Sequence, residues 1–221
     1  MKITTNGIKR EWNQNLHLEK WLPEIPDLNL DNDHVYWHEK QIIPNSVTQV
    51  IDARSQWEKK RHKETKHEWE PRGRKIHSCL EAFLRGRSYD PGEYADHVKH
   101  LVTYWLWDEW EAIACEYLLI DKRRGIAGSA DAILRHKEDH RRIAIADLKT
   151  NRLKISKKDI SPQLGGYVNL LNICWPELHV TDCFGIWSCP TETDSRRFEP
   201  IDALISYEGM RDGFFRKERQ F

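Results

Sequence analysis

Apolar and polar residues alternate along three consecutive stretches in the middle of the chain, at 112–121, 125–135 and 141–150. Alternation with a period of two is typical of β-strands, and short connections favour antiparallel pairing. The three stretches therefore predict an antiparallel meander. On its first strand, Glu116 is expected on one face, and the opposite face would hold Ile113, Cys115, Tyr117 and Leu119.

Helical patterns lie on both sides of this meander. Ser46 is a plausible N-cap for a helix over 47–60. A Pro-Arg-Gly turn precedes a helix predicted over 72–85, because Ile76, Leu80 and Leu84 form an apolar stripe. The other predicted elements are an aromatic-rich helix over 93–111, a helix that begins at Ser161-Pro162, a strand over 180–188 with residues 196–200 beside it, and a final helix from Pro200.

The order of these elements defines the expected fold class. The order is helices, three strands, a helix, a strand and a helix. This order predicts an α/β protein whose central mixed sheet consists of an antiparallel meander plus an added strand and is flanked by helices. A chain of 221 residues is long enough for one substantial core. The first forty residues are polar, with a short hairpin expected near Val35-Tyr36-Trp37. We therefore expect a single domain, with 1–70 as a helical and loop extension and 71–221 as the core.

Charge does not identify a partner at the level of the whole chain. Lys+Arg and Asp+Glu both number 35, so the formal net charge is zero and any basic surface must be local. The stretch 58–75 is a dense charge run with a basic excess. A solvated helix face and turn is its simplest interpretation, and a strip that contacts phosphates is the alternative. Lysines 154, 157 and 158 predict a basic loop after the meander.

Localisation is predicted from the apolar segments and the cysteines. No apolar run approaches the roughly 18 residues of a membrane span, and residues 1–15 lack the apolar centre of a secretory signal. Five scattered cysteines have no CxxC spacing, which disfavours both a zinc ribbon and a disulfide framework. We expect reduced thiols in the cytoplasm of a bacterial or phage-infected cell, without membrane contact.

Two carboxylates lie within the apolar strands of the meander. Asp131 stands between two alanines, and Asp147 follows an Ile-Ala-Ile-Ala run. Burying a carboxylate is costly unless it is paired or holds a metal. Lys149 shares a strand face with Asp147, since side chains two apart point the same way. These residues predict a cation site for Mg²⁺ or Mn²⁺, which favour hard oxygen ligands, with Lys149 placed to orient or deprotonate a water or to stabilise a charged transition state.

The pattern Asp131…Asp147-Leu148-Lys149 resembles the D-(x)n-D-x-K motif of the PD-(D/E)XK nuclease superfamily. Five flanking segments, spread with it over about residues 42–190, are similar to the RecB-like branch, which includes phage and mitochondrial genome maintenance exonucleases. In order they are PNSVT at 44–48 (PSVT with one residue inserted), RGRKIHSCLE at 72–81 (RGT-x-x-H-x-x-x-E, with Arg74 where threonine is usual), GSAD at 128–131, DLKT at 147–150 and QLGGY at 163–167.

The resemblance assigns roles to the matched residues. It implies one or two Mg²⁺ or Mn²⁺ ions held by His77, Asp131, Asp147 and the Leu148 carbonyl. Asp131, Asp147, Lys149 and Gln163 would be the catalytic residues, with Lys149 as the catalytic lysine and Gln163 steadying that lysine or the DNA phosphate. Without the resemblance, a lone histidine next to an apolar stripe is more often a packed structural residue. Accessory or DNA-binding roles fall on Glu116, Tyr167, Arg72, Arg74, Thr150 and Ser129. Glu116 is equally well explained as a solvent-facing strand carboxylate. No iron–sulfur cluster is expected, because Cys174, Cys183 and Cys189 are too irregularly spaced.

The implied activity is metal-dependent hydrolysis of DNA, most simply by an exonuclease that prefers single strands or processes ends during replication, recombination or repair. The chain has no GxxxxGK[ST] loop, so a helicase, recombinase or single-strand-binding protein would be a separate partner. The alternatives are a structure- or sequence-specific endonuclease on the same fold, a DNA-binding module with a decayed site, and chance matches in an unrelated α/β protein.

Overall fold

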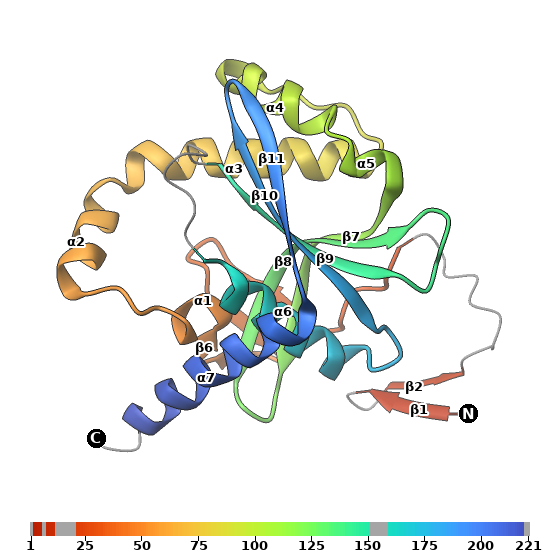
Figure 1. Cartoon of the computed structure of the whole chain (residues 1–221). Helices are drawn as coiled ribbons and strands as arrows, with labels where there is room; N and C mark the ends of the chain where they lie inside the picture. The colour runs from red at the N-terminus through yellow and green to blue at the C-terminus, as the bar shows by residue number, and fades with distance from the viewer. Residues whose placement is uncertain (1, 6–7, 12–20, 151–158, 219–221) are drawn as a thin grey trace.

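A computed structural model of the chain describes residues 2–5, 8–11, 21–150 and 159–218. Its centre is a six-stranded mixed sheet with helices on both faces (Figure 1). The predicted fold class is therefore confirmed. The division at residue 70 stays a prediction, and lysines 154, 157 and 158 lie outside the described residues. Within the described part of the chain, no helix is long and apolar enough to cross a membrane.

The predicted meander forms the middle of the sheet. Strands β7 (Trp110–Asp121), β8 (Ile126–His136) and β9 (Ile143–Lys149) pair antiparallel in chain order. The added strand is β10 (Val180–Cys189), which runs parallel to β9, and β11 (Glu192–Phe198) pairs antiparallel beyond it. Strand β11 contains part of the expected segment at 196–200 but begins earlier in the chain.

Strand β8 has two different partners along one edge. Strand β9 pairs with it from Ala132 to Arg135, whereas the short β6 (Asn45–Ser46) pairs in parallel at Ile126 and Ala127. The residues between these two pairings, Asp131 among them, are paired to neither strand. The sheet is thus open on this edge at the position of Asp131.

Two hydrophobic cores cover the faces of the sheet. One lies under α1 (Val47–Val50), α6 (Ser161–Cys174) and α7 (Pro200–Glu218). The other lies under α3 (Lys66–Leu84), α4 (Ala95–Val102) and α5 (Leu106–Glu109). Polar side chains that could form a site therefore lie at the margins of these two cores.

The helix expected over 47–60 is two helices. Ser46 caps α1 as predicted, and a capping box with Gln49 completes the cap. The helix ends at Val50 because Asp52 bonds the backbone of Arg54 and Ser55 caps a second helix, α2 (Gln56–Glu64), through Glu58. Local side-chain hydrogen bonds of this kind compete with a continuous helix.

Helix α3 begins at Lys66, so the expected start at Arg72 after a turn is wrong. Pro71 lies inside the helix and removes one hydrogen bond, to the carbonyl of His67. Both residues are exposed, so water can satisfy that carbonyl. The burial of Ile76, Cys79 and Leu80 on the other face favours the continuous helix.

The helix expected over 93–111 is also divided. A 3₁₀ turn (Gly92–Tyr94), α4 and α5 share this stretch, and Trp110 already belongs to β7. The expected hairpin near residues 35–37 is confirmed, since β4 (Tyr36–His38) pairs with both β3 (Leu28–Leu30) and β5 (Gln41–Ile43). A separate hairpin joins β1 (Lys2–Thr5) and β2 (Ile8–Glu11).

Candidate active site

The alternation breaks in the middle of both strands of the β7–β8 hairpin, and β7 has a further irregularity between Ala112 and Ala114. Cys115 and Tyr117 are two residues apart, yet they pack into opposite cores, and the same holds for Ala132 and Ala130. The expectation that Cys115 shares a face with Tyr117 is therefore wrong. The cause is Glu116, whose φ of 46° lies in the left-handed region, where a non-glycine residue is uncommon and strained.

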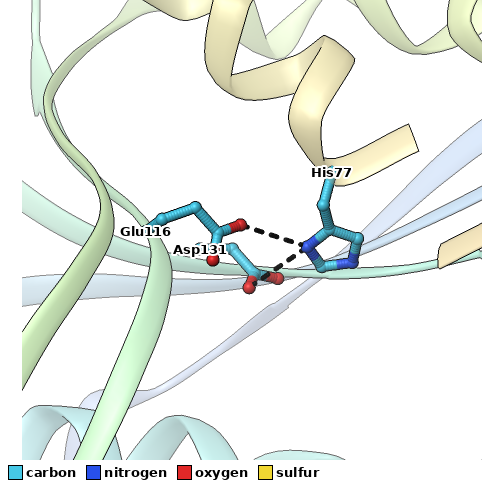
Figure 2. Close-up of side chains that lie close together, drawn as sticks. All are labelled: His77, Glu116 and Asp131. Carbon is cyan, nitrogen blue, oxygen red and sulfur yellow. Dashed lines mark hydrogen bonds and ion pairs between the residues drawn. The ribbon is translucent and has the colours of Figure 1, made fainter. Parts of the chain in front are cut away.

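Glu116 and Asp131 lie opposite one another at this break, because their flanking residues are paired. His77, from α3, points between them (Figure 2). Its Nδ1 lies 3.4 Å from Glu116 Oε1 and 3.4 Å from Asp131 Oδ1. One ligand atom from each residue fits within 4.8 Å of the others. Three residues far apart in the sequence thus converge on one point.

The side chain of Asp131 is oriented by a backbone hydrogen bond at the point where β8 and β9 separate. The last paired residues are Ala132 and Ala146, after which the two strands separate. The backbone N–H of Leu148 then donates to Asp131 Oδ2 at 2.6 Å. One carboxylate oxygen is therefore fixed by the backbone, and the other faces His77.

A second network lies beside this cluster. Lys149 Nζ is 2.6 Å from Asp147 Oδ2 and donates to Gln163 Oε1 at 2.9 Å. Gln163 Nε2 in turn donates to Asp147 Oδ1 at 2.8 Å and to the Tyr167 hydroxyl at 3.0 Å. Asp147 is buried at the end of β9, and α6 supplies Gln163 and Tyr167 one turn apart. The amide of Gln163 joins the ion pair to the helix.

The charges in the first cluster influence one another. Burial alone would lower the pKa of His77, but the carboxylates of Asp131 and Glu116 outweigh it and raise that pKa well above its ordinary value. Burial raises the pKa of Glu116, the His77 hydrogen bond opposes this, and the charge of Asp131 adds to it. The exposed carboxylate of Glu116 and the half-buried carboxylate of Asp131 thus depend on one positive charge between them.

The second network contains its own cation. Burial would lower the pKa of Lys149, but Asp147 and Asp131 outweigh it and raise the pKa. Burial raises the pKa of Asp147, and Lys149 opposes this. Among the described residues, Lys149 is the one partner of Asp147 Oδ2, so this oxygen has lone pairs left for a further ligand.

The donor set of the first cluster fits a divalent cation. An imidazole nitrogen and two carboxylates converge, and a cation can replace the proton of His77 as their shared positive charge. The carboxylate oxygens of this set suit Mg²⁺ and Mn²⁺. The residues present therefore can hold a metal.

The structure groups the proposed ligands differently from the sequence analysis. Glu116, expected only as an accessory residue, joins His77 and Asp131, while Asp147 faces Lys149 and Gln163. The Leu148 amide N–H contacts Asp131, whereas its carbonyl was the group proposed as a ligand.

The remaining predicted residues lie around the site or away from it. Ser129 is half-buried on β8, and Thr150 follows β9 with its hydroxyl facing Gly73. Arg74 is exposed and pairs with Glu70. Arg72 lies toward α4, where its charge lowers the pKa of His97 after the larger effect of burial.

Tyr36 is a neighbour of the site that sequence reasoning missed. Burial raises the pKa of its phenol to about 12, and the nearby carboxylates of Glu116 and Asp131 add to the effect. Tyr36 belongs to β4, in the small sheet that packs on β7 through β3. No local motif marks it, because its position depends on how that small sheet docks.

Comparisons with known proteins give limited information. No family model matches the chain, and no curated protein matches it. Among solved structures, the alkaline exonuclease LHK-Exo from Laribacter hongkongensis is similar over 78% of this chain and 86% of its own, with 12% identity and a TM-score of 0.40. The protein SSO0001 is similar over 77% and 74% respectively, with 16% identity and a TM-score of 0.39. At these values neither likeness establishes a family or an activity.

Proposed function

We propose that the chain is a Mg²⁺- or Mn²⁺-dependent deoxyribonuclease that hydrolyses phosphodiester bonds. The observation that carries this proposal is the convergence of His77, Glu116 and Asp131 beside the paired Lys149. A hydrolytic site for a phosphodiester needs positive charge for the phosphate and an oriented water, and these two groups supply places for both.

The proposed roles are metal binding for one group of residues and positioning of the water and the phosphate for the other. His77, Glu116 and Asp131 would hold the metal, with Asp147 Oδ2 as a further proposed ligand. When bound, the metal neutralises charge on the scissile phosphate and lowers the pKa of a coordinated water. Lys149, held by Asp147 and Gln163, presents a fixed ammonium group that orients the attacking water and stabilises the negative charge of the transition state. Tyr167 keeps Gln163 in place.

An exonuclease is the favoured form, because the motifs at 44–48, 72–81 and 163–167 resemble exonucleases of the RecB-like branch. DNA would be the substrate, as single strands or duplex ends. Any motor or recombinase would act as a separate protein.

A time course on end-labelled single- and double-stranded DNA, with Mg²⁺ and with Mn²⁺, tests the activity. A covalently closed circle in parallel separates the two cutting modes, since an exonuclease leaves it intact. We expect the wild type to degrade linear DNA, and Asp147→Ala and Lys149→Ala to be inactive. Activity that survives in both variants would contradict the site, and cleavage of the circle would favour an endonuclease.

A further inference from the structure

One face of α3 leads from the start of the helix to the candidate metal centre. Its residues recur at spacings of three and four, which places them on one side of a helix. They line a single cavity of about 550 Å³ together with His34 and Glu116. The α3 residues are Lys66, Trp69, Glu70, Gly73, Arg74, His77, Ser78 and Glu81.

Gly73 creates a gap in the middle of this face. Among the described residues, a Cβ on Gly73 would meet only Thr150 Oγ1 within 4 Å, at 3.7 Å, so these residues leave the space above the backbone open. Trp69 and His77 flank the gap, one turn away on either side. They are eight positions apart, which is about 12 Å along a helix axis. The cavity therefore lies between an indole and a candidate metal ligand.

Trp69 is fixed in orientation. The imidazole of His62 is stacked on it with ring centroids 4.3 Å apart, and Trp69 Nε1 donates to the His62 carbonyl at 3.3 Å. Trp69 remains half-buried and still borders the cavity. An aromatic ring that is already ordered loses little further freedom when a flat ligand packs against it.

Positive charge flanks the same gap. Lys66 and Arg74 both lie 3.2 Å from Glu70 Oε1, so two cations share one carboxylate. Their side chains are 50% and 71% exposed and can reach an anion. A ligand that suits this face has a flat apolar group for the cavity and negative charge beside it, which is the chemistry of a nucleotide.

We propose that this face of α3, from Lys66 to His77, binds an unpaired strand of DNA. A base enters the cavity beside Trp69, over Gly73, and backbone phosphates lie at Lys66 and Arg74. In a duplex each base is stacked between its neighbours and paired, so this binding requires a single strand or a frayed end. The inference rests on the proposed nuclease function and adds the strand state of its substrate.

The test is the affinity for a labelled oligothymidylate of about 12 nucleotides, measured by fluorescence anisotropy in EDTA, where no metal-dependent cleavage occurs. Stacking of a base on an aromatic side chain contributes about 1–3 kcal/mol, so Trp69→Ala should raise Kd by about 5- to 150-fold. Trp57→Ala is the matched control, since Trp57 is 66% exposed on α2 and does not line the cavity.

A second pair of variants fills the gap without removing the indole. Gly73→Leu should weaken binding, because the leucine occupies the place of the base. Gly209→Leu is the control, since Gly209 lies in α7 and a Cβ there meets nothing within 4 Å in the described part of the chain. An abasic oligonucleotide provides the readout specific to stacking. The wild type should bind the abasic strand as weakly as Trp69→Ala binds the normal strand. The Trp69→Ala variant should bind the normal and the abasic strand with equal affinity.

Equal losses for Trp69→Ala and Trp57→Ala, or the same loss on normal and abasic strands, would overturn the inference, as would a wild type that does not bind. Cleavage is measured in parallel with Mn²⁺. If the wild type binds as predicted but does not cleave, the nuclease proposal fails and the strand-binding face stands. If the wild type cleaves DNA while Trp69→Ala binds the strand as tightly as the wild type, the strand-binding face fails and the nuclease proposal stands.

Discussion

The two halves of the candidate site are built in opposite ways. In the first, the half-buried His77 and Asp131 meet the exposed Glu116, with nitrogen–oxygen contacts of 3.4 Å (Figure 2). In the second, Asp147 and Lys149 are joined at 2.6 Å and Gln163 bridges both. The first half has more negative than positive charge, whereas the second half includes its own cation.

This difference shows that a carboxylate in the sheet can either form an ion pair within the protein or remain able to bind a metal. Asp147 is stabilised by a lysine from its own strand, so that pair also contributes to the stability of the fold. Asp131 has one oxygen fixed by the backbone and the other in a cluster that gains from an added cation. The first half thus provides a place for metal, and the second holds a lysine beside it.

The largest effect is expected from Asp131→Asn. The substitution removes one charge from the cluster but keeps an oxygen that can accept from the Leu148 N–H, so the protein should fold. DNA cleavage should fall by about 10²–10³-fold or more, as when an electrostatic group is removed from an active site. Asp202→Asn, at an exposed position in the first turn of α7, is the control for rate. Comparable rates in both variants would refute a role for Asp131.

The second half should respond through stability as well as activity. Lys149→Met leaves the Asp147 carboxylate buried without its cation, which typically costs about 3–5 kcal/mol. The double variant Asp147→Asn/Lys149→Met should recover most of this loss in denaturant unfolding and remain inactive. A double variant as unstable as Lys149→Met would show that the pair is not what stabilises this region.

Metal should stabilise the protein through the first half. At a hundredfold excess over Kd, Mn²⁺ should raise the free energy of unfolding by about 2.7 kcal/mol. Glu116→Gln should reduce this gain, because it removes a charged ligand, and Asp202→Asn should keep it. The measurement is urea unfolding with and without Mn²⁺. An unchanged gain in Glu116→Gln would remove Glu116 from the ligand set.

The smallest effects are expected at α6. Gln163→Ala leaves buried polar groups of Asp147 and Lys149 without a partner, at a cost of about 1–3 kcal/mol. Tyr167→Phe removes only the hydroxyl that accepts from Gln163 and should cost about 0.5–1.5 kcal/mol. Urea unfolding and cleavage rates check both. A larger loss for Tyr167→Phe than for Gln163→Ala would contradict the bridging role of Gln163.

The parts of the fold that follow regular periodicity could be predicted. Alternation located the meander, and the spacing of Asp147 and Lys149 placed both on one face of β9, where they form their ion pair. The helix from Ser161-Pro162 was also located, and it brings Gln163 to the ion pair.

Local exceptions and tertiary docking could not be predicted. Glu116 reaches the cluster through a left-handed backbone conformation that alternation does not reveal. Pro71 was interpreted as a helix boundary, although the packing of Ile76 and Leu80 carries α3 through it. Tyr36 approaches the site only because a separate small sheet packs on β7.

The metal centre that we propose depends on His77, Glu116 and Asp131 holding a divalent cation together. Calorimetric titration of Mn²⁺ into the wild type, His77→Ala, Glu116→Gln and Asp131→Asn tests it most directly, with Asp202→Asn as the control. We expect a saturable site in the wild type and the control, and a clearly weaker one in each of the three variants. Mn²⁺ binding of unchanged affinity in all three variants would contradict it.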